Sequence, residues 1–209
     1  MACGESADGE TSFQVGVGAG FLDTSLDFDG GRRAEVEMTT FAASFARALR
    51  PRVTLLLSAG VVFDGEIRPE GRPAHDVDPG AALAAGVEYR QRAGDGWKPA
   101  VDFTAVLGAT WARTRDPRGC GRASYLATDA RVGVRAAWTV ADAVSPYAVS
   151  RVFGGPVFWE LDDDNSVASD IHHYQVAVGM AVSLGRIGLF GEWASLGERA
   201  VSAGATMVW

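Results

Sequence analysis

Apolar residues alternate with polar or small residues along most of the chain, with the two-residue period of a β-strand. From Phe13 to Phe21 every second residue is apolar or small, and Gln14 and three glycines occupy the positions between them. The pattern predicts an all-β protein. The same alternation recurs in seven further segments: Val53 to Phe63, Leu83 to Tyr89, Val101 to Trp111, Val132 to Trp138, Tyr174 to Val182, Ile187 to Trp193 and Arg199 to Trp209.

Two less regular segments, Ala34 to Leu49 and Tyr147 to Trp159, raise the expected number of strands to about ten, with eight as the alternative. Within the second segment, Gly154-Gly155-Pro156 predicts a bulge or kink, because proline cannot donate a ladder hydrogen bond. An even number of strands suits a closed, antiparallel up-and-down transmembrane β-barrel with both termini on one side.

The composition indicates that strands, and not helices, would cross a membrane. No run of about 18 apolar residues is present to form a transmembrane helix, and 26 of the 209 residues are glycine. The length suits a single barrel domain over residues 1–209. The opening residues, MACGESADGETS, lack the apolar core of a signal peptide, so we expect a mature form whose residues 1–11 are a disordered leader.

The connections predict which end of the barrel faces which compartment. Short turns follow the even-numbered strands, for example at Arg50-Pro51. Longer polar connections follow most of the odd-numbered strands, and only the last, around Gly197, is short. This asymmetry is typical of outer-membrane barrels, whose turns are periplasmic and whose loops are extracellular, so we expect both termini in the periplasm. The four long loops are predicted at Asp23 to Arg32, Asp64 to Gly80, Thr114 to Asp129 and Leu161 to Asp170.

The six tryptophans fall near the two predicted rims, as interfacial aromatic girdles do. The alternative is that they are core aromatics of a soluble β protein. On the membrane interpretation, the inner girdle is Trp97, Trp138 and Trp209, and the outer girdle is Trp111, Trp159 and Trp193.

The last strand carries a resemblance to a known class. Val201, Ala203, Ala205, Met207 and Trp209 are apolar at alternate positions and end on a carboxy-terminal aromatic residue. This segment resembles the closing strand of Gram-negative outer-membrane β-barrel proteins, with small opacity-protein or OmpA-like barrels the nearest in style. The resemblance implies location in the bacterial outer membrane and recognition of the closing strand by the barrel-assembly machinery.

A membrane barrel turns its apolar face to lipid and its polar face to the lumen. Charges of opposite sign inside a narrow barrel are expected to pair, because unpaired charges there are costly. We predict a charge-filled lumen in a structural or surface-displaying barrel, with a narrow charge-lined pore as the alternative. The predicted lumen residues are Glu35, Glu37, Glu88, Arg90, Asp102, Arg131, Arg135, His173, Gln175 and Glu192.

An enzyme of this architecture is a third hypothesis. The omptin proteases are ten-stranded outer-membrane barrels that carry paired acids and an Asp-His couple near the outer rim. This chain has Asp76-Val77-Asp78 beside His75, and Asp170-Ile171-His172, and a carboxylate can orient a histidine base. In this chain the acid and histidine pairs come after the long loops, whereas that family places them before the loops. The longer sequence motifs expected of that family are also missing. We therefore expect no enzymatic activity and no catalytic residues.

The remaining chemistry narrows the partners. A net charge of -7 disfavours nucleic acid, and no cofactor or metal motif is present. Cys3 and Cys120 show no ligand spacing, while Asp162-Asp163-Asp164-Asn165 is a solvated acidic tip or a calcium site. We expect a monomer whose main partner is the lipid bilayer. A soluble lipocalin-like barrel is the alternative fold, with its aliphatic face around a ligand.

Overall fold

The computed structural model describes residues 13–209 except 30, 96, 117–120, 141–142 and 162–163. The predicted leader, the two cysteines and the first two residues of the acidic tip lie outside the described residues. The described chain is all β, and it contains no helix long and apolar enough to span a membrane. The strands are β1 Phe13–Phe28, β2 Arg32–Arg50, β3 Val53–Pro69, β4 His75–Val77, β5 Gly80–Arg92, β6 Ala100–Arg115, β7 Arg122–Ala137, β8 Val144–Gly154, β9 Val157–Leu161, β10 Asp164–Asp170, β11 Tyr174–Leu184, β12 Ile187–Gly197 and β13 Arg199–Val208.

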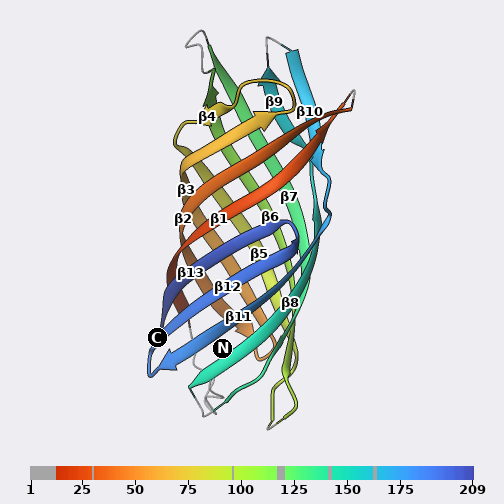
Figure 1. Ribbon diagram of the computed structural model, residues 1–209. Coiled ribbons are helices and arrows are strands. Elements are labelled where there is room, and N and C mark those ends of the chain that lie inside the picture. The colour runs from red at the N-terminus through yellow and green to blue at the C-terminus, as the bar shows by residue number, and fades with distance from the viewer. Residues whose placement is uncertain (1–12, 30, 96, 117–120, 141–142, 162–163) are drawn as a thin grey trace.

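Ten of these strands form a closed antiparallel ring, which we call the lower ring. Its order is β1, β2, β3, β5, β6, β7, β8, β11, β12, β13 and back to β1. The ring closes where Gln14 in β1 is opposite Val208 in β13. Both described chain ends therefore lie at one end of the barrel, the lower end in Figure 1. The prediction of a closed ten-strand barrel is confirmed.

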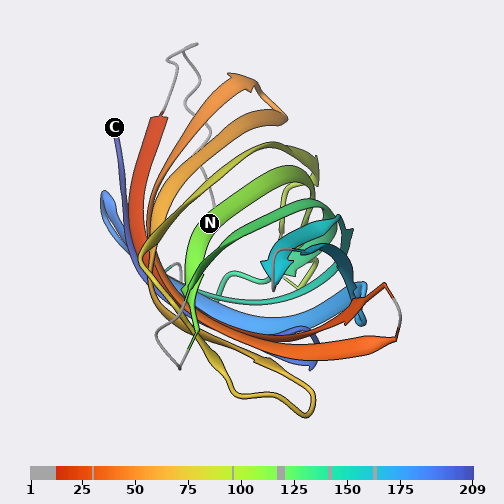
Figure 2. The same cartoon turned by 90° about the horizontal axis from the view of Figure 1, so that it is seen from above.

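A second ring continues above the first. There β1, β2, β3, β6 and β7 extend beyond the lower ring, and the short strands β4, β9 and β10 complete an eight-stranded circuit, which we call the upper ring. Strand β4 lies between β3 and β6, and the β9–β10 hairpin bridges β7 and β1 (Figures 1 and 2). Ten strands thus narrow to eight along one barrel.

Strand β1 shows how the sequence produces the two rings. Its outward side chains are apolar as far as Phe21 and polar from Asp23 onward. Its inward side chains change in the opposite sense, from Gln14 and glycines below to Leu26 and Phe28 above. The lower ring therefore presents an apolar surface suited to lipid, whereas the upper ring has the apolar-in, polar-out arrangement of a water-soluble barrel.

The upper ring is filled by a hydrophobic core. Trp159 is 1% exposed, and its indole N–H donates a hydrogen bond of 2.9 Å to the Thr114 hydroxyl. Phe28 and His75 contact the same indole ring, with centroids 5.8 and 5.2 Å away. Further buried members of this core are Leu26, Ala34, Val36, Met38, Val62, Ile67, Val77, Ala112, Tyr125, Val157 and Ala168.

Most residues of the predicted long loops are strand residues of the upper ring. Three of these predicted loops contain the ends of β1, β2, β3, β6 and β7, and the fourth, Leu161 to Asp170, contains β10. The loop prediction is wrong here because the outward face becomes polar at the membrane boundary while the inward face becomes apolar. The strands therefore continue beyond the membrane boundary.

The predicted kink at Gly154-Gly155-Pro156 separates β8 from β9. Strand β7 pairs with β8 up to Gly154 and then with β9 from Val157, so the short break lets the chain leave one ring and enter the other. A Cβ atom on Gly155 would collide with the carbonyl of Thr128. Glycine is therefore required by the close approach of two backbones.

Candidate functional site

The lumen of the lower ring holds two groups of charged side chains. The first lies on β5, β6 and β7, where Arg90 is directly opposite Asp102 and Asp102 directly opposite Arg135. Asp102 is 1% exposed, and its two oxygens accept hydrogen bonds from Arg90 at 3.0 Å and from Arg135 at 2.7 Å. Glu88 accepts a bond of 3.3 Å from Arg135. The free-energy cost of burying the Asp102 carboxylate is offset by its two guanidinium partners.

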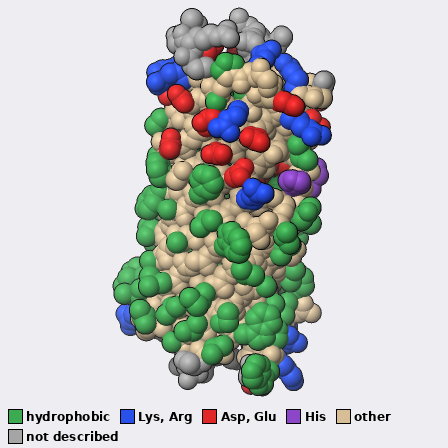
Figure 3. All heavy atoms as spheres, in the orientation of Figure 1, with side chains coloured by type: hydrophobic (Ala, Val, Ile, Leu, Met, Phe, Trp, Pro, Cys, Tyr) green, Lys and Arg blue, Asp and Glu red, His purple; other side chains and the backbone are tan. Residues whose placement is uncertain are grey.

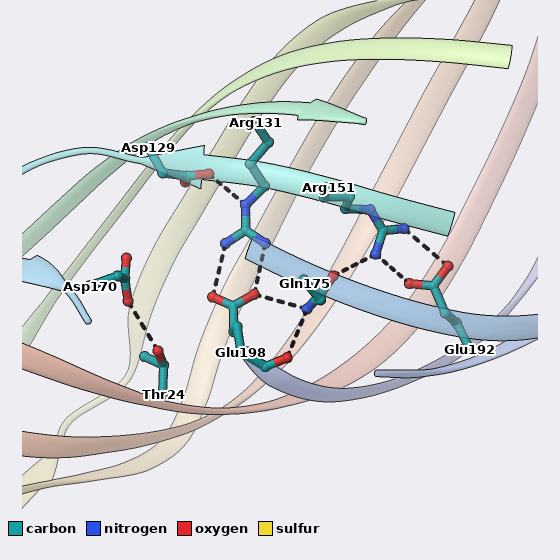
Figure 4. A network of polar contacts seen from close by, with 8 residues as sticks. All are labelled: Thr24, Asp129, Arg131, Arg151, Asp170, Gln175, Glu192 and Glu198. Carbon is teal, nitrogen blue, oxygen red and sulfur yellow. Dashed lines mark hydrogen bonds and ion pairs between the residues drawn. The ribbon is translucent and has the colours of Figure 1, made fainter. Parts of the chain in front are cut away.

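The second group crosses the lumen beneath the upper ring (Figure 4). Arg131 binds Glu198 through two bonds of 2.9 and 3.3 Å and Asp129 through one of 2.6 Å. Arg151 binds Glu192 in the same two-bond manner, at 2.7 and 3.0 Å. Such bidentate pairs fix both geometry and orientation. They join β7 and β8 to β12 and the turn that follows it.

Gln175 connects the two pairs of the second group. Its amide oxygen accepts a bond of 2.6 Å from Arg151, and its amide nitrogen donates a bond of 3.0 Å to Glu198. Glu198 is 2% exposed and lies in the turn between β12 and β13, next to Gly197. The positive φ of Gly197, 78°, allows the tight turn that directs this carboxylate inward.

Asp170, the last residue of β10, lies at the same junction. Its carboxylate accepts a hydrogen bond of 3.0 Å from the Thr24 hydroxyl. Burial raises the pKa of Asp170, and the charge of Glu198 adds to the increase, while the Thr24 bond opposes it. With Asp129, Glu192 and Glu198, this makes four carboxylates around two guanidinium groups. The junction therefore carries an excess of negative charge.

Three of the predicted lumen residues lie elsewhere. Glu35 and Glu37 project outward from the upper part of β2, and Glu35 contacts the exposed Arg68 at 3.4 Å. They were placed in the lumen because the rule that charged side chains of a membrane barrel point inward was applied beyond the membrane boundary. His173 precedes β11 and is exposed. The remaining seven residues predicted for the lumen take part in the two groups just described: Glu88, Arg90, Asp102, Arg131, Arg135, Gln175 and Glu192.

Four residues of the second group and its junction were missed by sequence reasoning: Asp129, Arg151, Asp170 and Glu198. Arg151 follows the alternation of β8, which was the only available signal. Asp129 was assigned to a loop although it is in β7, and Asp170 and Glu198 lie where strands end. Their pairing depends on which strands lie side by side in the folded sheet, and no local sequence pattern specifies this.

Among the six tryptophans predicted for the two girdles, Trp159 lies in a different place from the one predicted. Trp111 and Trp193 are outward and about half exposed, and Trp209 stacks on Phe13 with centroids 5.4 Å apart. Trp97 is 95% exposed in the β5–β6 turn. Trp138 follows β7 and is partly buried. Trp159 is a correction to the prediction, because it points into the upper core and cannot meet a membrane interface.

The structure does not bring the two acid and histidine motifs together. Asp76 lies in β4 on the outer face, and Asp78 pairs with Arg115 at 2.6 Å. Asp170 lies in β10, separated from β4 by β1, β2 and β3, and its carboxylate faces Thr24. His172 is exposed. The geometry of a carboxylate pair facing an Asp-His couple is not formed by these residues.

A metal site is not formed by the described residues either, since they contain no group of three or more His, Cys, Asp or Glu side chains arranged to hold an ion. The charged lumen residues are arginines and carboxylates in mutual contact, which stabilise one another. Chemically, this arrangement cross-links neighbouring strands of the barrel wall: β5, β6 and β7 in the first group, and β7, β8, β11 and β12 in the second.

Comparisons with known proteins agree with this architecture. No protein-family model matches the sequence, and no curated protein is significantly similar to it. The outer membrane protease OmpT from Escherichia coli superposes with a TM-score of 0.58 and 8% identity, over 95% of this chain and 97% of that one. The outer membrane protein OprG from Pseudomonas aeruginosa gives 0.55 and 10%, over 95% and 96%. The fold is that of an outer-membrane β-barrel embedded in a lipid bilayer, as predicted from the sequence.

Proposed function

We propose that the protein is a non-conducting outer-membrane barrel that holds a rigid, polar-faced cylinder above the lipid for display at the cell surface. The observation that carries this proposal is the solid core of the upper ring. Val62, Ile67 and Trp159 are 0 to 1% exposed and lie in the path that a solute would follow. Packed protein interiors leave few voids larger than a water molecule.

The lumen below supports the same conclusion. Arg131 and Arg151 bind Glu198 and Glu192 over the inner face of β8 and β11, so two bidentate pairs occupy part of the lumen beneath the core. Removing one partner of such a pair leaves a buried charge, at a cost of about 3–5 kcal/mol. The two layers together close the barrel.

The outer face of the upper ring is suited to display because its polar side chains stand on hydrogen-bonded strands. Asp23, Asp27, Glu35 and Glu37 project outward from β1 and β2, and Figure 3 shows acidic and basic side chains gathered toward this end of the molecule. A surface built on strands loses little conformational entropy when a partner binds.

Orientation follows from the same features. The chain ends lie with the short turns, which face the periplasm in outer-membrane barrels, so the upper ring would stand outside the cell. We further propose that the protein is a monomer in the bacterial outer membrane, inserted by the barrel-assembly machinery through β13, and that it has no catalytic activity. Separation of Asp76 and Asp78 from Asp170 and His172 supports the last point.

Conductance across a planar bilayer tests closure. We expect the folded protein to add no steady ion current. A reproducible single-channel current would overturn the proposal and support a narrow pore. That second candidate is favoured by a cavity of about 350 Å³ in the lower part of the lumen, near Arg90 and Arg135. Insertion of the silent protein is verified by its heat-modifiable gel mobility.

Labelling of whole cells tests display. In a background with Cys3 and Cys120 replaced by serine, a cysteine is placed at Glu35 in the upper ring or at Arg50 in a turn. An impermeant maleimide is expected to label the Glu35→Cys protein on intact cells and the Arg50→Cys protein only after the outer membrane is opened. The reverse pattern would place the upper ring in the periplasm and refute surface display.

A further inference from the structure

The lower ends of β2 and β5 and the turns that follow them carry a group of exposed basic side chains, of which Arg92 donates a hydrogen bond of 3.1 Å to the Pro99 carbonyl. The β2–β3 turn and the β5–β6 turn lie side by side, because Val53 at the start of β3 pairs with Tyr89 near the end of β5. All five basic residues are exposed. We call them the turn cluster: Arg47, Arg50, Arg52, Arg92 and Lys98.

Within the described part of these two turns, the cluster has little opposing charge. Asp95 is exposed in the β5–β6 turn and pairs its backbone with Lys98. The ion pairs recorded among the described residues lie in the lumen or at the upper ring and include none of the five. Like charges held this close repel one another, so the cluster favours an anionic partner.

The neighbours of the cluster are apolar. Trp97 is 95% exposed between the cluster residues of the β5–β6 turn, and Leu49 is half exposed between Arg47 and Arg50. The outward faces of β2 and β5 lead from the cluster onto the lipid-facing surface through Phe41 and Tyr89. In the face shown in Figure 3, basic side chains reappear at the lower margin, beside hydrophobic ones.

A partner that satisfies both features has an anionic head and apolar tails. Long arginine and lysine side chains extend from apolar surface toward headgroups, and an exposed tryptophan sits at headgroup level. We propose that the turn cluster binds anionic phospholipids of the leaflet that surrounds the turns, through their phosphate headgroups, and so anchors the lower rim. The inference does not depend on whether the barrel conducts or displays.

Native mass spectrometry of the protein in uncharged detergent tests the proposal. Phosphatidylglycerol and phosphatidylcholine with the same acyl chains are titrated separately, and the retained lipid is counted. We expect the wild type to retain phosphatidylglycerol preferentially. Each basic residue near an anionic lipid contributes about a fivefold increase in binding, equivalent to about 1 kcal/mol, so the variant Arg47→Gln/Arg50→Gln/Arg52→Gln should lose most of the preference.

The matched control removes three exposed arginines from the other end, as Arg33→Gln/Arg113→Gln/Arg199→Gln, with the same change of net charge. It should retain phosphatidylglycerol as the wild type does. Equal retention of both lipids by the wild type, or an equal loss in the control, would overturn the proposal. Displacement of the lipid by inorganic phosphate would also overturn it, by indicating a site for free anions.

Heat-modifiable mobility shows whether each variant is folded. If the cluster variant does not fold, the salt dependence of the wild type decides the question. Added sodium chloride should weaken retention of phosphatidylglycerol and leave phosphatidylcholine unchanged, because exposed charges are screened over about 10 Å at 0.1 M salt. Retention that is indifferent to salt would contradict an electrostatic site. This experiment is separable from conductance, so failure of one proposal leaves the other standing.

Discussion

Replacement of Trp159 by alanine is expected to open the upper ring without unfolding the lower one. The indole is buried among Leu26, Phe28 and His75, and it satisfies the hydroxyl of Thr114, which is 0% exposed. Truncation of a buried tryptophan to alanine costs about 3–5 kcal/mol. The orphaned hydroxyl adds about 1–3 kcal/mol where water cannot reach it.

Amide hydrogen exchange measures this cost locally, because it reports the free energy of opening for each segment. For Trp159→Ala we expect exchange in β9, β10 and the upper part of β7 to be about 10²- to 10⁴-fold faster, the equivalent of about 3–5 kcal/mol. Strands β11, β12 and β13 belong to the lower ring alone, so their protection should not change.

Two further variants separate packing from hydrogen bonding. Trp159→Phe keeps most of the ring contacts and loses the N–H donor, so its effect should be the smaller. Adding Thr114→Val to Trp159→Phe removes the orphaned hydroxyl and should recover part of the loss. Uniform acceleration across both rings, or unchanged exchange in β9 and β10, would refute the division of the barrel into a lipid-facing ring and a separately packed upper core.

The other predictions concern the junction between the rings. Glu198→Gln should lower stability by about 1.5–3 kcal/mol in chemical unfolding, because Arg131 loses its bidentate partner and keeps only Asp129; an unchanged midpoint would show that the pair contributes nothing. Gly155→Ala should prevent close packing at the break, whereas Gly191→Ala, whose added Cβ would have its nearest neighbour at 4.0 Å, should behave as wild type in gel mobility; equal mobility of both would contradict this. Burial raises the pKa of Asp170, so the folded state prefers its protonated form and loses stability as the pH rises through the folded pKa. Asp170→Asn should therefore melt higher than wild type at neutral pH and equally in acid; a lower melting temperature at neutral pH would refute the sign.

The lower ring could be predicted from the sequence because each of its strands has a local signal. Lipid requires apolar residues at alternate outward positions, and this period is visible in β1, β6 and β11 without knowledge of their partners. The break before β9 was also predictable, since Gly154-Gly155-Pro156 limits pairing.

The candidate site was predictable only in part. Arg90, Asp102 and Arg135 were found because they occupy inward positions of regular strands and are opposite one another in the register. The partner of Arg131 was not found, because Glu198 lies in a turn whose inward direction depends on Gly197 and on closure of the barrel. Interactions between side chains of non-adjacent strands depend on the tertiary arrangement of those strands.

The upper ring was not predicted from the sequence, because the two faces of its strands change character at the membrane boundary. Along β1, the apolar outward positions end at Phe21, so a prediction based on the outward positions alone ends the strand there. The inward positions continue the alternation through Leu26 to Phe28, so the strand persists while the solvent outside it changes from lipid to water. The register of the strand is continuous, so the outward side chains become polar at the same level at which the inward side chains become apolar. The change that takes the outer surface out of the membrane therefore also produces the hydrophobic core that closes the barrel.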